Sequence, residues 1–484
     1  MPMTGRTIDR RTFLAGGAAA ASVALAPPIV RAQNKHKILV IGAGLSGLNA
    51  ALTLQMGGAD VQVIEGSRRI GGRVLSNRNV DGAPEFGGTS MGAGYARIVD
   101  TAKNLGVGLI DITASVPFFR ARELALDGAV IRKEDWPNHP RNPFPPALKS
   151  MMPWAYFFSL MGRGTPLKSV DDWVNPEYAH LDISVHDWMT AKGATPEMIE
   201  LGYNVNASFG DNAHDISILQ LFFSVAFAGI QQELGPKGVY GYTAVNGNQS
   251  IPEAMAAALD NEIHFGREVM GIRSDASGAE VHCADGTRYQ ADYVICSVPF
   301  AVLRNIKVDP VFTGTQAMAV QSLPSQLMTL VHLVPKRPYW EEDGMAAAMF
   351  TDTPAGIVLA ERKGSSPEEI TSITAWARGP DAAYLDRLDE KDARAVVVKS
   401  IETIRPAAKG LLEVGGYKSW YRDPFAAGDW AYWRPGQITA FARGMAKPHG
   451  RIHLCGEHTA VSNRGMEGAM ESGERAALEI FAKL

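Results

Sequence analysis

The stretch KILVIGAGLSG, residues 37–47, decides the fold class of this 484-residue chain. After Lys37 its first residues are apolar, which is typical of a strand buried in a parallel sheet. The three glycines that follow have the G-x-G-x-x-G spacing of a turn that binds a dinucleotide. A helical pattern of apolar residues comes next, and Gly57 and Gly58 end it.

Each glycine of the turn has a physical role. Gly42 permits the sharp turn, Gly44 lets the backbone approach a pyrophosphate, and Gly47 lets the helix pack closely on the strand. Ser46 lies in the first helical turn, where free N–H groups and the helix dipole stabilise a phosphate. A second strand ends at Glu65, an acid placed to accept hydrogen bonds from ribose hydroxyls. The segment therefore predicts a βαβ unit that holds a dinucleotide.

The other strand and helix patterns are spread along the whole chain. Strands are predicted at residues 262–265, 280–283, 291–299, 327–334 and 452–455, with a hairpin turn at 285–286. Helices are predicted at residues 196–203 and 216–227 and from Gly465 onward.

The predicted fold class is α/β, with a discontinuous Rossmann-like dinucleotide-binding domain and a mixed α+β substrate-binding domain. The dinucleotide-binding domain is predicted to combine residues 36–90, 240–306 and 441–484. The substrate-binding domain is predicted to combine residues 91–239 and 307–440.

Residues 1–32 differ from the rest of the chain and predict an export signal. Arg10 and Arg11 precede an Ala/Gly-rich apolar stretch, residues 15–26, and the sequence VRA at 30–32 fits a cleavage site. The paired arginines resemble a twin-arginine signal, which exports folded, cofactor-loaded proteins. We therefore expect the twin-arginine (Tat) export machinery as a partner and the periplasm as the location. No later run approaches the length of a membrane span, so no stable span is expected.

Composition and charge exclude several classes of protein. Hydrophobic residues make up 46% and charged residues 20% of the chain, which permits a sizeable core. The formal net charge of −4 gives no footprint for nucleic acid, so no nucleic-acid partner is expected. The three cysteines, Cys283, Cys296 and Cys455, have no metal-site spacing and are predicted to be buried free thiols. No metal site is predicted.

Several further motifs together resemble the flavin amine oxidase superfamily. That superfamily includes monoamine oxidases, polyamine oxidases, L-amino acid oxidases and bacterial nicotine-oxidising enzymes. The motifs are EGSRRIGGR at 65–73, EFGG at 85–88, NGNQSIP at 246–252, DYVICSVP at 292–299, GEHTA at 456–460 and GMEGAMESG at 465–473. They extend over nearly the whole chain after the signal, and the resemblance implies that the dinucleotide is FAD.

The resemblance also implies roles for individual residues. The match of Arg73 contacts the FAD phosphates in the family, and a guanidinium suits phosphate. The backbone of Val269 would bind adenine, and Glu457 the ribityl or phosphate region. Backbone N–H groups at the start of the last helix would face the flavin ring. The candidate cofactor-binding residues are Gly42, Gly44, Ser46, Gly47, Glu65, Gly66, Arg73, Gly87, Gly88, Val269, Glu457, Gly465, Met466 and Glu467.

The substrate side departs from the family pattern. Trp430 matches one wall of the family's aromatic cage and is the candidate catalytic residue, whereas the second wall falls on Gly465. This one-sided cage implies a larger or branched substrate. Asp429 stands where monoamine oxidases carry the cysteine that bonds FAD, so non-covalent FAD is expected. The family's lysine beside the flavin, associated with reoxidation by oxygen, is replaced by Met328 or Thr329.

Three other polar side chains are candidates for a role at the site. His332 is predicted to pack or satisfy a local hydrogen bond rather than to take part in catalysis. Arg120 and Arg122 could bind a carboxylate.

The reaction implied is oxidation of a small-molecule amine, with electrons passing to O2 or a periplasmic electron acceptor. Two alternatives stay open. One is a carbon–carbon desaturase of the phytoene or protoporphyrinogen type, and the other is a FAD-binding protein without turnover. The sequence also leaves open which amine reacts and whether the protein forms a homodimer.

Overall fold

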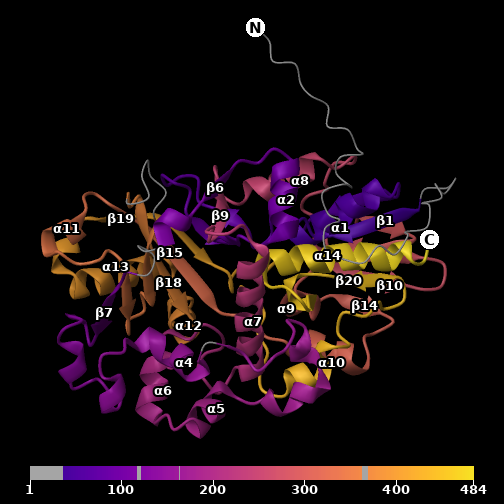
Figure 1. Ribbon diagram of the computed structural model, residues 1–484. Coiled ribbons are helices and arrows are strands. Elements are labelled where there is room, and N and C mark those ends of the chain that lie inside the picture. Colours follow the sequence, from indigo (N-terminus) through magenta and orange to yellow (C-terminus); the bar gives the residue numbers. More distant parts are fainter. Residues whose placement is uncertain (1–35, 117–120, 163, 362–368) are drawn as a thin grey trace.

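The structure is a computed structural model that describes residues 36–116, 121–162, 164–361 and 369–484 (Figure 1). The predicted export signal at residues 1–32 lies outside these residues. Across the described ranges, no helix has the length and apolar character needed to span a bilayer.

A four-stranded parallel sheet gathers strands from three distant parts of the chain. Its order is β2-β1-β13-β20, formed by β1 (Lys37–Ile41), β2 (Asp60–Ile64), β13 (Tyr293–Cys296) and β20 (Ile452–Leu454). Ile38 and Val40 pack in one hydrophobic cluster, and Leu39 and Ile41 pack in another. Both faces of the sheet are therefore covered, which explains why β1 is apolar almost throughout.

Two long helices cover the first of these faces. They are α1 (Leu45–Met56) and the C-terminal α14 (Gly465–Phe481), which lie against each other near the C-terminus in Figure 1. A side chain at Gly473 would lie 2.2 Å from the carbonyl oxygen of Ser46, so glycine permits this close contact.

Three antiparallel strands with one added parallel strand cover the second face. The sheet has the order β12-β11-β10-β14, formed by β10 (Val269–Ser274), β11 (Ala279–Cys283), β12 (Arg288–Ala291) and β14 (Lys307–Asp309). The turn between β11 and β12 carries the predicted Asp-Gly pair at 285–286.

A seven-stranded sheet forms the other half of the molecule, on the left in Figure 1. Its order is β19 (Leu412–Ser419), β15 (Met328–Pro335), β18 (Ser372–Arg378), β17 (Ile357–Glu361), β16 (Met349–Thr351), β7 (Glu123–Leu126) and β8 (Ala129–Ile131). One face carries α11 (Tyr339–Asp343), α12 (Pro380–Leu385) and α13 (Glu390–Ile404). Val331 and Leu333 point to this face, while Met328 and Leu330 join a separate cluster.

The remaining elements join the two halves. Helices α4 (Pro153–Met161), α5 (Val185–Ala191) and α6 (Pro196–Gly202) lie below the large sheet, and α7 (Ile218–Leu234) stands between the two halves (Figure 1). A small sheet of β5 (Met91–Gly92), β9 (Gly241–Ala244) and β6 (Leu109–Asp111) lies beside α2 (Ala96–Asn104) and α8 (Ser250–Ala257). Short elements are β3 (Leu75–Ser76), β4 (Glu85–Gly87), α9 (Phe300–Leu303) and α10 (Gly314–Ser322).

The predicted α/β fold class, with a Rossmann-like part assembled from separate stretches of chain, is confirmed. The domain boundaries stay a prediction. Two observations favour placing β14 and α2 in the dinucleotide-binding domain. β14 pairs with β10 across the predicted boundary at 306, and α2 packs against α14 in one hydrophobic cluster.

The predicted strand at residues 262–265 is wrong. Only His264 forms an isolated bridge, to Ile64, and its N–H donates to the carbonyl of Val63 at 3.0 Å. The chain there runs parallel to the end of β2 for this single residue pair and turns away at Gly266, which has φ +68°. A segment that pairs at one residue only shows the same sequence pattern as a short strand. The other predicted strands and helices are confirmed, with α7 extending to Leu234.

Candidate cofactor and substrate site

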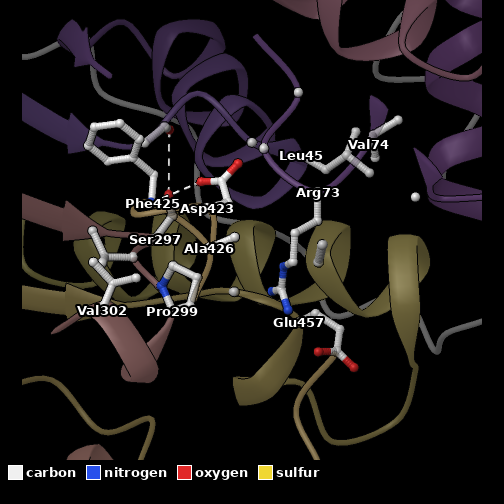
Figure 2. A pocket seen from close by; sticks show the side chains of 18 of the residues that line it. Leu45, Arg73, Val74, Ser297, Pro299, Val302, Asp423, Phe425, Ala426 and Glu457 are labelled. Atoms are coloured by element: carbon white, nitrogen blue, oxygen red, sulfur yellow. Dashed lines mark hydrogen bonds between the residues drawn. The ribbon is translucent and has the colours of Figure 1, made fainter. Parts of the chain in front are cut away.

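One cavity of about 470 Å³ lies between the parallel sheet and the seven-stranded sheet. Its wall is made by the turn after β1, the ends of β2 and β13, the starts of β15 and α14, and the segment 423–430. Figure 2 shows side chains from these distant segments around one space. The cavity therefore lies beyond the carboxyl ends of the parallel strands, where open α/β sheets bind ligands.

The turn after β1 presents an uncapped helix end to this cavity. Gly44 is the N-cap of α1, no side chain caps the helix, and its first turn carries no acid. Gly42 has φ +105°, and a side chain there would lie 2.3 Å from the hydroxyl oxygen of Ser297. That hydroxyl donates to the carbonyl of Ile41 at 2.7 Å. The free N–H groups and the positive end of the dipole suit a phosphate.

Glu65 lies on the cavity wall at the end of β2. Its carboxylate accepts hydrogen bonds from the backbone N–H groups of Ala43 and Ser67, each at 2.8 Å. These two bonds fix the orientation of the buried carboxylate and leave lone pairs for donors in the cavity. A ribose, whose hydroxyl groups are donors, fits this arrangement.

The segment at residues 71–73 touches the glycine turn backbone to backbone. The N–H of Gly71 donates to the carbonyl of Ala43 at 2.9 Å. A side chain at Gly72 would lie 3.3 Å from the Cα of Gly44, and Gly72 has φ +58°. Because Gly44 and Gly72 have no side chains, the backbone surface at this contact stays open, and an extended dinucleotide can lie on it.

Three charged residues meet further along the wall. Arg73 donates from its guanidinium to the backbone carbonyl of Asp429, and in Figure 2 the Arg73 side chain extends toward the segment that carries Glu457. Burial raises the pKa of Asp429 to about 7; Arg73 opposes this rise and Glu457 adds to it. Asp429 lies deep in the protein, and its remaining accessible surface faces the cavity. It is thus a carboxyl group that can change charge near neutral pH.

Most of the candidate residues line this cavity. Those on the wall are Gly42, Gly44, Ser46, Glu65, Gly66, Arg73, Gly87, Gly88, Val269, Trp430, Glu457, Gly465 and Met466.

Gly47 and Glu467 are not on the wall. A side chain at Gly47 would lie 2.1 Å from the carbonyl oxygen of Gly42, so Gly47 serves the packing behind the turn. The Glu467 carboxylate accepts from the N–H groups of Arg97 and Ile98, at 3.1 and 3.2 Å, and so holds the start of α2. The side chain of Glu467 therefore points away from the cavity.

Trp430 is one of several aromatic residues on the cavity wall, which also include Phe86, Tyr95 and Trp376. Trp430 lies on the wall and meets Phe209 edge to face, with ring centres 5.8 Å apart. At Gly465 an added side chain would meet nothing within 4 Å, and the residue has φ +55°. The position expected to carry a second aromatic wall is therefore open space.

The cavity-facing side of β15 is apolar. Met328 and Leu330 line the wall, whereas the hydroxyl of Thr329 donates to Asp386 at 2.8 Å on the other face. Met328 thus occupies the cavity-facing position of the two that the sequence left open.

A family model described as a flavin containing amine oxidoreductase matches residues 45–481 of this chain. The chain belongs to this family. Its members are flavoproteins and oxidoreductases that act on amines, so this flavin amine oxidoreductase uses a flavin cofactor.

Named relatives and solved structures agree with this family. A flavin-containing amine oxidase of Danio rerio is 26% identical, with 93% of this chain and 87% of the relative covered. An L-amino-acid oxidase of Demansia vestigiata is 24% identical, with the same coverage. Cyclohexylamine oxidase from Brevibacterium oxydans (TM-score 0.73, 21% identity) and putrescine oxidase bound to putrescine (TM-score 0.72, 23% identity) share the fold. Each covers 93% of this chain and 99% of the solved chain.

The three cysteines of this flavin amine oxidoreductase are free and buried, as predicted, and none of them lines the cavity. His332 is also placed as predicted. Its ring stacks on Phe86 with centres 4.1 Å apart, and Nδ1 is 3.0 Å from the amide nitrogen of Asn77.

No sequence motif indicated several of the residues that line the cavity. Phe425 closes over Gly66, where a side chain would lie 2.6 Å from its ring, and Ser297 supports the turn at Gly42. These contacts join residues hundreds of positions apart, so no local pattern could have revealed them. Arg122 does not line the cavity and lies over the ring of Trp154 at 5.4 Å. Arg120 lies outside the described residues.

Proposed function

We propose that this flavin amine oxidoreductase oxidises an amine with FAD held non-covalently in the cavity. The observation that carries the proposal is the continuity of the space. One end has the dinucleotide features, namely the bare α1 terminus and Glu65, and the other end has the aromatic wall at Trp430. Bound FAD would supply the redox chemistry by accepting a hydride at N5 from the carbon that bears the amine. The resulting imine then hydrolyses to a carbonyl compound and an amine or ammonia.

The protein's own residues position the reactants and limit water. The uncapped N-terminus of α1 would take the diphosphate, Glu65 the ribose, and Trp430 one face of the substrate. The β15 face, with Met328 and Leu330, adds an apolar surface that favours the neutral amine, the form able to give up a hydride. No acid or base beside Trp430 is required for this reaction.

The shape of the substrate end favours amines larger than simple monoamines. Gly465 leaves open the place of a second aromatic wall, so a branched or bulky group fits beside Trp430. The electron acceptor is proposed to be O2 or a periplasmic electron carrier. Met328, which stands where many relatives have a lysine, provides no ammonium group to assist the reaction with oxygen.

An anaerobic screen tests the function. The purified yellow protein is mixed without oxygen with a panel of primary, secondary and amino-acid amines, and the flavin absorbance near 450 nm is followed. Loss of that absorbance with an amine supports the proposal. Loss only with polyenes or porphyrinogens would replace it with a desaturase. A flavin that no compound in either panel reduces would indicate a binding protein without turnover.

FAD is expected to be released unmodified when the protein is denatured in acid. No cysteine lines the cavity, and Asp429 occupies the position of the family's bonding cysteine. Dispersed contacts suffice, because submicromolar binding needs only about 8 kcal/mol. The supernatant after acid precipitation should contain FAD of normal mass by absorbance and mass spectrometry. Yellow colour that stays in the washed pellet would contradict non-covalent binding.

We also propose export to the periplasm by the twin-arginine route, on the grounds of Arg10 and Arg11 in the sequence. Replacing both by lysine should keep active, flavin-loaded precursor in the cytoplasm. Cell fractionation with immunoblotting against the chain measures this. A double variant that reaches the periplasm as efficiently as the unaltered chain would show that the arginines are not the signal.

A further inference from the structure

Asp429 is an acidic residue whose backbone is fixed on both sides at the cavity wall. Its N–H donates to the carbonyl of Gln326 at 2.9 Å, and the N–H of Gln326 donates to the carbonyl of Trp430, also at 2.9 Å. The carbonyl of Asp429 accepts from the guanidinium of Arg73. Asp429 lines the cavity between these contacts, so its carboxyl group has a defined place on the wall.

Two acids share this part of the wall with one cation. Glu457 accepts from the backbone N–H of Ala431 at 3.5 Å, which brings its carboxylate close to Asp429. Within the described ranges, neither acid forms an ion pair, and Arg73 is the cation that acts on Asp429. Arg73 can balance only one of the two negative charges. Since like charges in a desolvated site oppose each other's ionisation, the pair readily holds a proton.

The surroundings of Asp429 place its titration near neutral pH. Burial raises the pKa of Asp429 to about 7; Glu457 adds to the rise, and Arg73 and the backbone N–H of Trp430 oppose it. Gln326, which contacts the backbone of Asp429, carries no charge. The proton occupancy of Asp429 therefore responds to any further charge that appears in the cavity.

The proposed reaction produces such a charge. Trp430, the next residue, lines the substrate end, so Asp429 lies where electrons are transferred rather than at the ribose end marked by Glu65. Reduction of FAD by two electrons and one proton adds one negative charge to the bound cofactor. A negative charge nearby favours the protonated form of a carboxyl group.

We propose that Asp429 takes up a proton when the flavin is reduced and thereby couples the reduction potential to pH. This inference rests on the proposed amine oxidation with FAD and adds a role for one wall residue. The C–H bond of the amine supplies two electrons and one proton as a hydride. The additional proton comes from solvent and forms an O–H bond on the Asp429 carboxylate. When an acceptor removes the two electrons from the flavin, that proton returns to solvent.

Reduction potentials of the flavin-loaded protein between about pH 5.5 and 9 test this coupling. The protein is equilibrated without oxygen with a reference dye and a slow chemical reductant, so no amine is needed. Each proton taken up with two electrons contributes about 30 mV per pH unit. Below about pH 7 Asp429 already holds its proton, so the potential should fall more steeply above that pH, by about 30 mV per pH unit. Loss of a proton from the reduced flavin itself would instead make the plot flatter as the pH rises.

Two asparagine variants assign the extra proton. Asp429→Asn should remove the steeper part of the plot above pH 7. Asp386→Asn is the matched control, because burial also raises the pKa of Asp386 but this residue does not line the cavity. It accepts from Thr329 on the other face of β15, so its variant should keep the steeper part. Plots of the same shape for Asp429→Asn and the unaltered protein would overturn the inference.

A proton count gives a second readout that does not depend on turnover. At pH 8 in weak buffer, reduction of the unaltered protein should take up about one more proton per flavin than reduction of Asp429→Asn. If that variant does not retain FAD, Asp429→Ala replaces it. If neither retains FAD, the unaltered protein decides, and a plot that nowhere steepens as the pH rises would overturn the inference. If no amine reduces the flavin, the proposed function fails, while the dye titration still tests Asp429.

Discussion

Replacing Ser46 by aspartate is expected to lower the affinity for FAD by about 100-fold or more while leaving the protein folded. Ser46 lies on the cavity wall in the first turn of α1, whose N-terminus no side chain caps. A carboxylate there interacts favourably with the helix dipole, so the helix itself should not be weakened. The same carboxylate would stand beside the proposed diphosphate, and repulsion between close charges reaches about 4 kcal/mol at an effective dielectric near 20.

The matched control for this change is Ser46→Asn, which has nearly the same shape without the charge. Titration of the flavin-free proteins with FAD, followed by fluorescence, should show a much smaller loss for the asparagine variant. The melting temperatures of all three flavin-free proteins should remain close. Equal losses for asparagine and aspartate would mean that size rather than charge matters, and would contradict a phosphate at α1.

Replacing Asp429 by asparagine is expected to stabilise the flavin-free protein at pH 8 and to have little effect at pH 4. Burial raises the pKa of Asp429 to about 7, against about 3.9 in an unfolded chain. Below pH 4 both states carry the proton. Between pH 4 and 7 the unfolded chain loses its proton first, so stability falls as the pH rises. The asparagine variant lacks this loss, and its advantage above pH 7 reaches up to about 4 kcal/mol.

Urea unfolding at several pH values measures this difference. The backbone carbonyl of Asp429, which accepts from Arg73, is unchanged in the variant. Asp423→Asn is the control of opposite sign: although burial opposes it, a hydrogen bond from Lys418 lowers the pKa of Asp423. That control variant should be less stable than the unaltered protein at pH 8. A constant difference in stability between Asp429→Asn and the unaltered protein from pH 4 to 8 would show that Asp429 does not titrate in this range.

The sequence predicted most reliably what local patterns encode. The strand, glycine turn and helix that begin at Lys37 follow from apolar runs and from the conformations open to glycine, and they appear as expected. The same reasoning failed at residues 262–265, where only His264 pairs with the end of β2. Period and composition cannot distinguish a short strand from a segment that pairs at one residue, because the neighbouring strand decides how far the pairing extends.

Site residues were predictable where a backbone motif defined them and less so where side chains meet across the fold. Glu65 lies at the wall because the turn and strand place it there. Glu467 lies in the first turn of α14, yet its side chain holds α2, a contact that no local pattern encodes. Phe425 reaches the site through its contact with Gly66, more than 200 positions away. Such neighbours follow from tertiary packing alone.

The most direct test of the account is a stoichiometric anaerobic reduction. The holoenzyme is titrated without oxygen with an amine found in the screen, and flavin absorbance, carbonyl product and released amine or ammonia are measured together. The account predicts one equivalent of carbonyl product and one of amine or ammonia for each flavin reduced. Flavin reduction without loss of the amine group from the substrate, or with formation of a carbon–carbon double bond, would contradict it.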